Sequence, residues 1–74
     1  MDQIEERLLR TFNKTFKSRE TSLDISRQSY SEWDSMKHAE LIIQLQKEFK
    51  LKFDIMSVLE IQNLKDFLPI VRSN

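Results

Sequence analysis

The sequence predicts an all-α domain: a small four-helix bundle with three main helices, one short helix and a long first loop. Two observations carry this prediction. The 74 residues include no glycine and one proline, and without glycine the tight hairpin turns of β-sheets are disfavoured. Apolar residues also recur at spacings of three and four, which is the pattern of a helix that buries one face. The length corresponds to a single domain, 1–74.

Length and composition argue against most classes of function. A core of this size leaves little room for an enclosed catalytic cavity, so we expect an interaction or carrier module and not an enzyme. The absence of cysteine removes disulfides, thiolate metal sites and a thiol nucleophile, and the single histidine, His38, argues against a zinc or iron site. Without glycine, P-loops and dinucleotide-binding loops are excluded.

Charge and hydropathy bear on the partners and the cellular compartment of the chain. Twelve basic residues balance twelve acidic ones, and this net charge of zero argues against a nucleic-acid partner. The apolar runs are short and charges interrupt the N-terminus, so the sequence predicts neither a membrane span nor a secretory signal. We expect a cytoplasmic monomer, and the lack of cysteine is compatible with a reducing cytoplasm.

The first helix is expected over residues 3–16 and the longest connection over 18–34. The helix carries an apolar side chain at every fourth position: Ile4, Leu8, Phe12 and Phe16. The connection contains five serines, which compete with helix formation by bonding the nearby backbone. Its apolar residues are expected to pin the loop to the core, because a free linker has no use for them. They are Leu23, Ile25, Tyr30 and Trp33.

The second helix, expected over residues 36–50, has the strongest amphipathic pattern. Its core-facing residues are Leu41, Ile42, Leu45 and Phe49, with His38 and Ala39 extending the stripe towards the N-terminus. Met36 and Ile43 stand seven residues apart on a stripe that is partly rotated from this face. For these two, periodicity alone favours a wide core face over an exposed apolar strip for a partner.

Two shorter helical segments complete the chain. They cover about residues 54–60 and 64–71. Asp54 is the expected N-cap of the first, and Asn63 with Asp66 resembles a capping pair at the start of the second. The residues of the first that should face the core are Ile55, Val58 and Leu59. Pro69 removes a backbone donor and crowds the carbonyl four residues earlier, so the last helix is expected to be short, kinked or irregular at its end.

Ser35 stands where the loop ends and the second helix begins. Unpaired backbone N–H groups and the positive end of the helix dipole meet there, and they would stabilise a phosphate ester on the hydroxyl. An ordinary N-cap by Ser35 or Asp34 is the simpler interpretation and is favoured by position alone. A hydrolytic Ser35–His38 pair is disfavoured, because a surface helix start offers no oxyanion pocket. We expect His38 to be a partly exposed helix residue.

The residues around Ser35 resemble the signature of acyl carrier proteins. Asp34-Ser35-Met36 stands where that family has an Asp-Ser-Leu motif that opens the second helix, and Phe49 follows fourteen residues after the serine. The tryptophan before the motif resembles small stand-alone carriers whose loop ends in Trp-Asp-Ser. The resemblance extends over nearly the whole chain, including the helix order and the long first loop. It implies that Ser35 carries 4′-phosphopantetheine through a phosphodiester and that an acyl group rides on this arm as a thioester.

The resemblance also implies roles for neighbouring residues. Asp34 matches the acid that helps to bind metal in the complex with the phosphopantetheinyl transferase. Met36 replaces the usual leucine, and Glu40 matches an acidic position that faces the acyl-loading and acyl-processing enzymes. Ile43 matches an apolar contact on the same exposed side, which reverses the core placement that periodicity favours. Glu48 matches the last acid of the cluster that ends the helix.

Charge distinguishes this chain from the family that it resembles. The family's second helix is usually strongly acidic, whereas residues 35–53 carry four lysines against two glutamates, a balance of +2. Lys37 and Lys47 are the interface residues expected to set the chain apart, and electrostatic steering towards basic partner enzymes would be weaker. A dedicated carrier in a specialised pathway of fatty acid or polyketide biosynthesis is therefore expected in place of a housekeeping carrier.

Two alternatives stay open. The same scaffold could serve as an aminoacyl or peptidyl carrier of the D-alanyl type, because the sequence does not specify the cargo. A different class of function is a small helical adaptor without a prosthetic group, which would bind partners through Met36, Ile43 and the loop aromatics.

Overall fold

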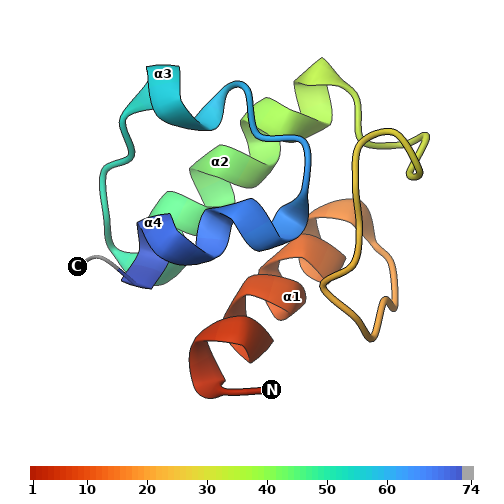
Figure 1. Cartoon of the computed structure of the whole chain (residues 1–74), viewed down its shortest axis with the longest axis horizontal. Helices are drawn as coiled ribbons and strands as arrows, with labels where there is room; N and C mark the ends of the chain where they lie inside the picture. The colour runs from red at the N-terminus through yellow and green to blue at the C-terminus, as the bar shows by residue number, and fades with distance from the viewer. Residues whose placement is uncertain (73–74) are drawn as a thin grey trace.

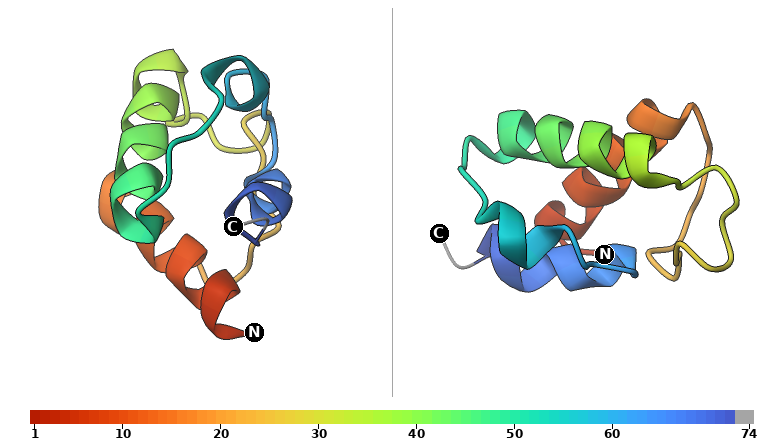
Figure 2. Two further views of the ribbon diagram at one scale, coloured as in Figure 1. Left: turned by 90° about the vertical axis from the view of Figure 1, so that its left-hand side faces the viewer. Right: turned by 90° about the horizontal axis from the view of Figure 1, so that it is seen from above.

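The computed structural model describes residues 1–72, and over this range the chain is all α without a β-strand. The elements are α1 (Gln3–Phe16), α2 (Ser35–Phe49), α3 (Ile55–Val58), the 3-10 helix η1 (Leu64–Phe67) and α4 (Leu68–Arg72), as drawn in Figure 1. This confirms the predicted small helical bundle with its long first loop. α1 packs against α2 and α4, and the chain after α2 returns to place α3 near the start of that helix (Figure 2). None of the helices in residues 1–72 is long and apolar enough to span a membrane.

α1 begins at a reciprocal cap and ends at a left-handed residue. The Asp2 carboxylate accepts the N–H of Glu5 at 2.8 Å, and the Glu5 carboxylate accepts the N–H of Asp2 at 2.9 Å. The hydrogen bond from the Glu5 N–H is the main reason that the pKa of Asp2 is lowered. At the other end Lys17 has φ 53°, a conformation usually taken by glycine. The predicted bounds of this helix are confirmed.

α2 begins one residue earlier than predicted, because Asp34 caps it. The Asp34 Oδ1 atom accepts the N–H of Lys37 at 2.9 Å, and Lys50 ends the helix with φ 55°. The predicted core residues Leu41, Ile42 and Leu45 are buried. Ala39 was placed on the same stripe, and this prediction is wrong: the residue is exposed. At about 100° per residue it stands beyond the edge of the buried face.

The core lies between α1, α2 and the last helical segment, and the long loop closes it. Its most deeply buried side chains are Phe12, Phe67, Leu8, Leu41, Leu45, Leu64 and Val58. Trp33 packs edge-on against Phe12, with ring centroids 5.5 Å apart, and against Phe16 at 5.9 Å. Tyr30 contacts the same two rings, and the loop residues Leu23 and Ile25 are buried. The prediction that these apolar residues pin the loop is confirmed.

α3 is shorter than predicted and presents only Val58 to the core. Ile55 and Leu59 are each 47% exposed, so their predicted inward orientation is wrong. The three residues stand at i, i+3 and i+4 and so share one side of a helix, but the single turn of α3 is buried against the core only at Val58. Asp54 caps α3 as predicted, because its carboxylate accepts the N–H of Met56 at 3.2 Å.

The last helical segment starts as a 3-10 helix because of Pro69. In an α-helix the Lys65 carbonyl would accept the N–H of residue 69, which proline lacks. The N–H of Leu68 bonds to this carbonyl instead, in the tighter 3-10 geometry. The predicted irregularity therefore lies before Pro69 and not at the end of the helix. Asn63 makes no capping bond to the backbone and reaches only the Asp66 carboxylate, at 3.4 Å, so the predicted capping pair is wrong.

Candidate functional site at the start of α2

Ser35 is the first residue of α2 and its side chain is exposed. Asp34 precedes it in an extended conformation, and the Asp34 Oδ1 atom accepts the N–H of Lys37. Within residues 1–72 no hydrogen bond engages the Ser35 hydroxyl or the Asp34 Oδ2 atom. The junction thus presents an unoccupied hydroxyl beside an unoccupied carboxylate oxygen, at the positive end of a long helix.

A buried hydrogen-bond chain fixes this junction. The Trp33 indole Nε1–H donates to His38 Nδ1 at 3.0 Å, and His38 Nε2 lies 2.8 Å from the Val58 carbonyl oxygen. An indole nitrogen can only donate, so Nδ1 must accept and the imidazole proton must be on Nε2. His38 therefore donates to Val58. This chain, called here the Trp33–His38–Val58 clasp, joins the end of the loop, the first turn of α2 and α3.

The expectation of a partly exposed His38 is wrong, because the side chain is 2% exposed. Burial lowers the pKa of His38, the hydrogen bond to Val58 opposes this effect, and the charge of Arg27 adds to the lowering. Both ring nitrogens are engaged by groups other than Ser35, so the imidazole holds the junction and does not activate the hydroxyl. The signal in the sequence was the continuation of the buried stripe of α2 to position 38.

An apolar rim, formed by Met36 and Ile43, lies on α2 after the exposed serine. Met36 is 83% exposed and Ile43 49% exposed, so the reversed placement of these two residues outside the core is the correct one. With Glu40 and Asp34 they line a shallow cavity of about 520 Å³ on the outer side of α2. Four of the residues predicted to contact partners therefore line one cavity together with Asp34, the residue before the serine: Met36, Lys37, Glu40 and Ile43.

Lys37 belongs to this surface but is anchored to α1. Its Nζ atom lies 3.3 Å from the Glu40 carboxylate, 3.4 Å from the Thr15 carbonyl oxygen and 5.9 Å from the centre of the Phe16 ring. The ammonium group thus neutralises Glu40 and reaches back over the core. A partner at this surface therefore meets Lys37 and Glu40 as an ion pair.

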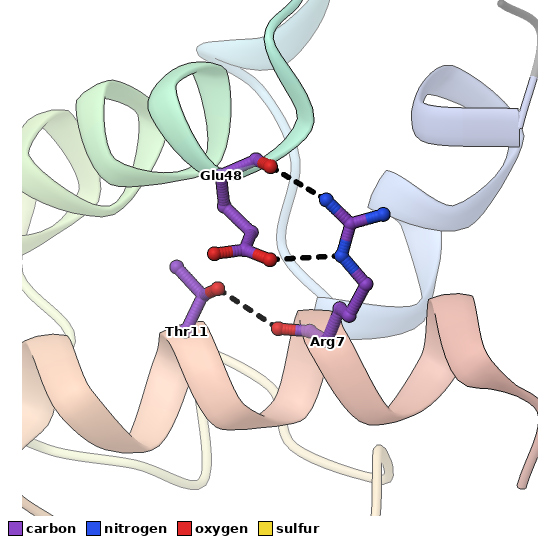
Figure 3. Close-up of polar contacts among 3 residues, drawn as sticks. All are labelled: Arg7, Thr11 and Glu48. Carbon is purple, nitrogen blue, oxygen red and sulfur yellow. Dashed lines mark hydrogen bonds and ion pairs between the residues drawn. The ribbon is translucent and has the colours of Figure 1, made fainter.

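The two predicted interface residues near the end of α2 lie apart from the serine. Lys47 is exposed and lines a separate groove with Ile43. Glu48 is half-buried in the contact between α1 and α2, where its carboxylate accepts Arg7 Nε–H at 2.8 Å and its carbonyl accepts Arg7 Nη2–H at 2.6 Å (Figure 3). Arg7 also lies over the Phe49 ring at 4.4 Å. No local pattern in the sequence indicates this contact, because its partners are 41 residues apart.

Comparisons with protein-family models, with curated proteins and with solved structures find no match to this chain. The resemblance to acyl carrier proteins therefore rests on the residues themselves.

Proposed function

We propose that this chain is an acyl carrier protein in which the Ser35 hydroxyl holds a 4′-phosphopantetheine arm. The observation that carries the proposal is the state of Ser35: exposed, free of hydrogen bonds within residues 1–72, and placed at the start of a helix anchored by the Trp33–His38–Val58 clasp. The Asp34-Ser35-Met36 motif and the helix order, which resemble the acyl carrier family, support the same assignment.

Attachment of the arm would use the chemistry of the junction. The Ser35 oxygen would form a new ester bond to the phosphorus of the pantetheinyl donor. The P–O bond between that phosphorus and the rest of the donor would break, the rest of the donor would depart as a phosphate leaving group, and the hydroxyl proton would pass to a base of the transferase. The positive end of α2 favours the resulting phosphodiester by about 0.3–1 kcal/mol. Asp34 Oδ2 would serve the metal of the transferase complex, the role implied by the resemblance.

The proposed cargo is an acyl group bound as a thioester. The chain has no cysteine, so the thiol of the arm must supply the sulfur. The apolar rim of Met36 and Ile43 offers partner enzymes a contact surface next to the arm, and methionine adapts to differently shaped partners. The balanced charge of the chain favours a dedicated carrier of a specialised pathway over a general carrier of fatty-acid synthesis. The proposed location is the cytoplasm, with which the lack of cysteine is compatible.

Intact-mass measurement tests the proposal. The chain is co-expressed with several phosphopantetheinyl transferases, and we expect one added phosphopantetheinyl group on the wild type and none on Ser35→Ala. Ser31→Ala is the matched control, because Ser31 is an exposed serine of the preceding loop and its removal should leave the addition intact. Absence of the added mass with every transferase, or its persistence in Ser35→Ala, refutes the assignment. The mass of the loaded arm from the native source separates an acyl from an aminoacyl cargo.

The exposure of Met36 and Ile43 also favours a second function, a helical adaptor without a prosthetic group. The two proposed functions differ in the expected effect of Ser35→Ala. An adaptor keeps its partner binding in Ser35→Ala and loses it in Met36→Ser, whereas a carrier loses its activity in both.

A further inference from the structure

A second concave surface lies away from Ser35, between the last turns of α2 and the chain that follows. This groove, called here the α2-end groove, has a volume of about 380 Å³. Its floor is apolar and consists of Ile43, Leu51, Phe53 and Ile55. Ile43 and Ile55 are half exposed, so the groove leaves apolar surface in contact with water.

The walls of the groove are held by hydrogen bonds within the chain. Lys50 takes the left-handed conformation that reverses the backbone, and the N–H of Leu51 bonds to the Gln46 carbonyl at 3.1 Å. The Gln46 side chain then accepts the N–H of Phe53 at 2.8 Å. The groove is therefore formed before any partner arrives, which lowers the entropic cost of binding.

The rim of the groove is positively charged. Lys47 and Lys52 line the groove and are exposed, and Lys50 is an exposed neighbour of both in the sequence. None of the three forms an ion pair with another residue in the range 1–72. The two acids nearest in sequence are already engaged: Glu48 with Arg7, and Asp54 with the start of α3. The positive charge at this end of α2 thus has no partner inside the described part of the molecule.

We propose that the α2-end groove binds a segment of a partner protein that presents an apolar side chain between carboxylates. The apolar side chain would displace water from Ile43 and Ile55, and the carboxylates would meet the lysines of the rim. An anionic membrane fits less well, because the apolar surface is concave and the exposed acids Asp54 and Glu60 flank α3. The charge selected in the partner is opposite to that expected for partners of the acidic second helix in the family that this chain resembles.

The inference stands apart from the proposed arm, so it is tested on the Ser35→Ala protein, which cannot carry one. The ¹⁵N-labelled protein is titrated with a synthetic amphipathic peptide that places leucines between glutamates, and with the same peptide carrying lysines in place of the glutamates. We expect the acidic peptide to shift the amide signals of Ile43 and of residues 51–55. Its affinity should fall as salt rises towards about 0.15 M, because exposed charges are screened.

Charge reversal supplies the decisive comparison. In Lys47→Glu/Lys52→Glu the affinity for the acidic peptide should fall about tenfold and the basic peptide should become the better ligand, because attraction at the rim becomes repulsion. Arg10→Glu/Lys14→Glu on the exposed face of α1 makes the same change of net charge and should leave binding intact.

Three results would overturn the proposal. The first is the absence of a preference for the acidic peptide, either because the two peptides bind equally or because neither binds at the solubility limit. The second is an equal loss of affinity in the α1 control, which would point to net charge alone. The third is co-sedimentation of the wild type with vesicles of anionic lipid that is abolished by Lys47→Glu/Lys52→Glu, which would assign the groove to a membrane surface.

Discussion

Replacement of His38 should cost a large part of the stability of this domain. In His38→Leu the ring is removed and the Trp33 Nε1–H, on a side chain only 2% exposed, loses its acceptor. An orphaned buried donor costs about 1–3 kcal/mol. The Val58 carbonyl is less affected, because it keeps a hydrogen bond from the Ile61 N–H at 3.2 Å. Its lost bond to His38 costs about 0.5–1.5 kcal/mol.

The expected loss, the sum of the two costs, is therefore about 1.5–4.5 kcal/mol in the free energy of unfolding. A domain of 74 residues has about 4–11 kcal/mol in total, at roughly 0.05–0.15 kcal/mol per residue. Urea unfolding measures the change, with the fluorescence of Trp33, the single tryptophan of the chain, and far-ultraviolet circular dichroism as two probes.

Two further variants separate the contributions of the two hydrogen bonds in the Trp33–His38–Val58 clasp. In His38→Asn the amide oxygen can replace Nδ1 as the acceptor for Trp33, whereas in His38→Gln the amide nitrogen can replace Nε2 as the donor to Val58. Within residues 1–72 the Trp33 N–H has no other acceptor, whereas the Val58 carbonyl has another donor, so Asn should retain more stability than Gln. A Leu variant within about 0.5 kcal/mol of the wild type, inside the range of ordinary surface substitutions, would refute the reasoning. So would a Gln variant that is more stable than Asn.

Three other predictions follow from the same contacts. Folding lowers the pKa of His38 below its ordinary 6.5. The stability that depends on neutral His38 should therefore be complete above that pH and fall below it, because acid protonates the unfolded state preferentially. The difference in the free energy of unfolding between wild type and His38→Gln, measured across pH 5–8, should isolate this effect. Arg7 and Glu48 are 39% and 38% exposed, so a double-mutant cycle with Arg7→Met and Glu48→Gln should give a coupling energy of only about 0.5–1 kcal/mol. A coupling energy near zero would show that this pair does not stabilise the packing of α1 against α2. Lys17→Gly should raise the free energy of unfolding by about 0.5–1 kcal/mol, because glycine adopts the φ of 53° at this position without steric cost. Lys14→Gly, inside α1, should lower it by about 1 kcal/mol. Thermal unfolding compares the two variants, and an equal loss of stability in both would contradict the strain at position 17.

Features set by neighbouring residues could be predicted from the sequence. The bounds of α1, the N-cap of α3 and the buried face of α2 all depend on side chains within one or two helical turns. The exposure of Ser35 followed from its place at a helix start. The position of α2 was wrong by one residue, because two adjacent residues could both cap it and only the backbone geometry chose Asp34.

The rest required contacts between segments that are distant in the chain. The burial of His38 depends on the Val58 carbonyl twenty residues later, and the role of Glu48 depends on Arg7, 41 residues earlier. No local pattern encodes such pairs, because they form only when helices pack. The sequence alone therefore determined that this protein is a helical bundle with an exposed serine at the start of its second long helix. Tertiary packing decided which polar side chains hold the start of α2, where that serine lies, and which charges remain on the surface. The physical reason is that a residue is buried or exposed according to the element that packs against it.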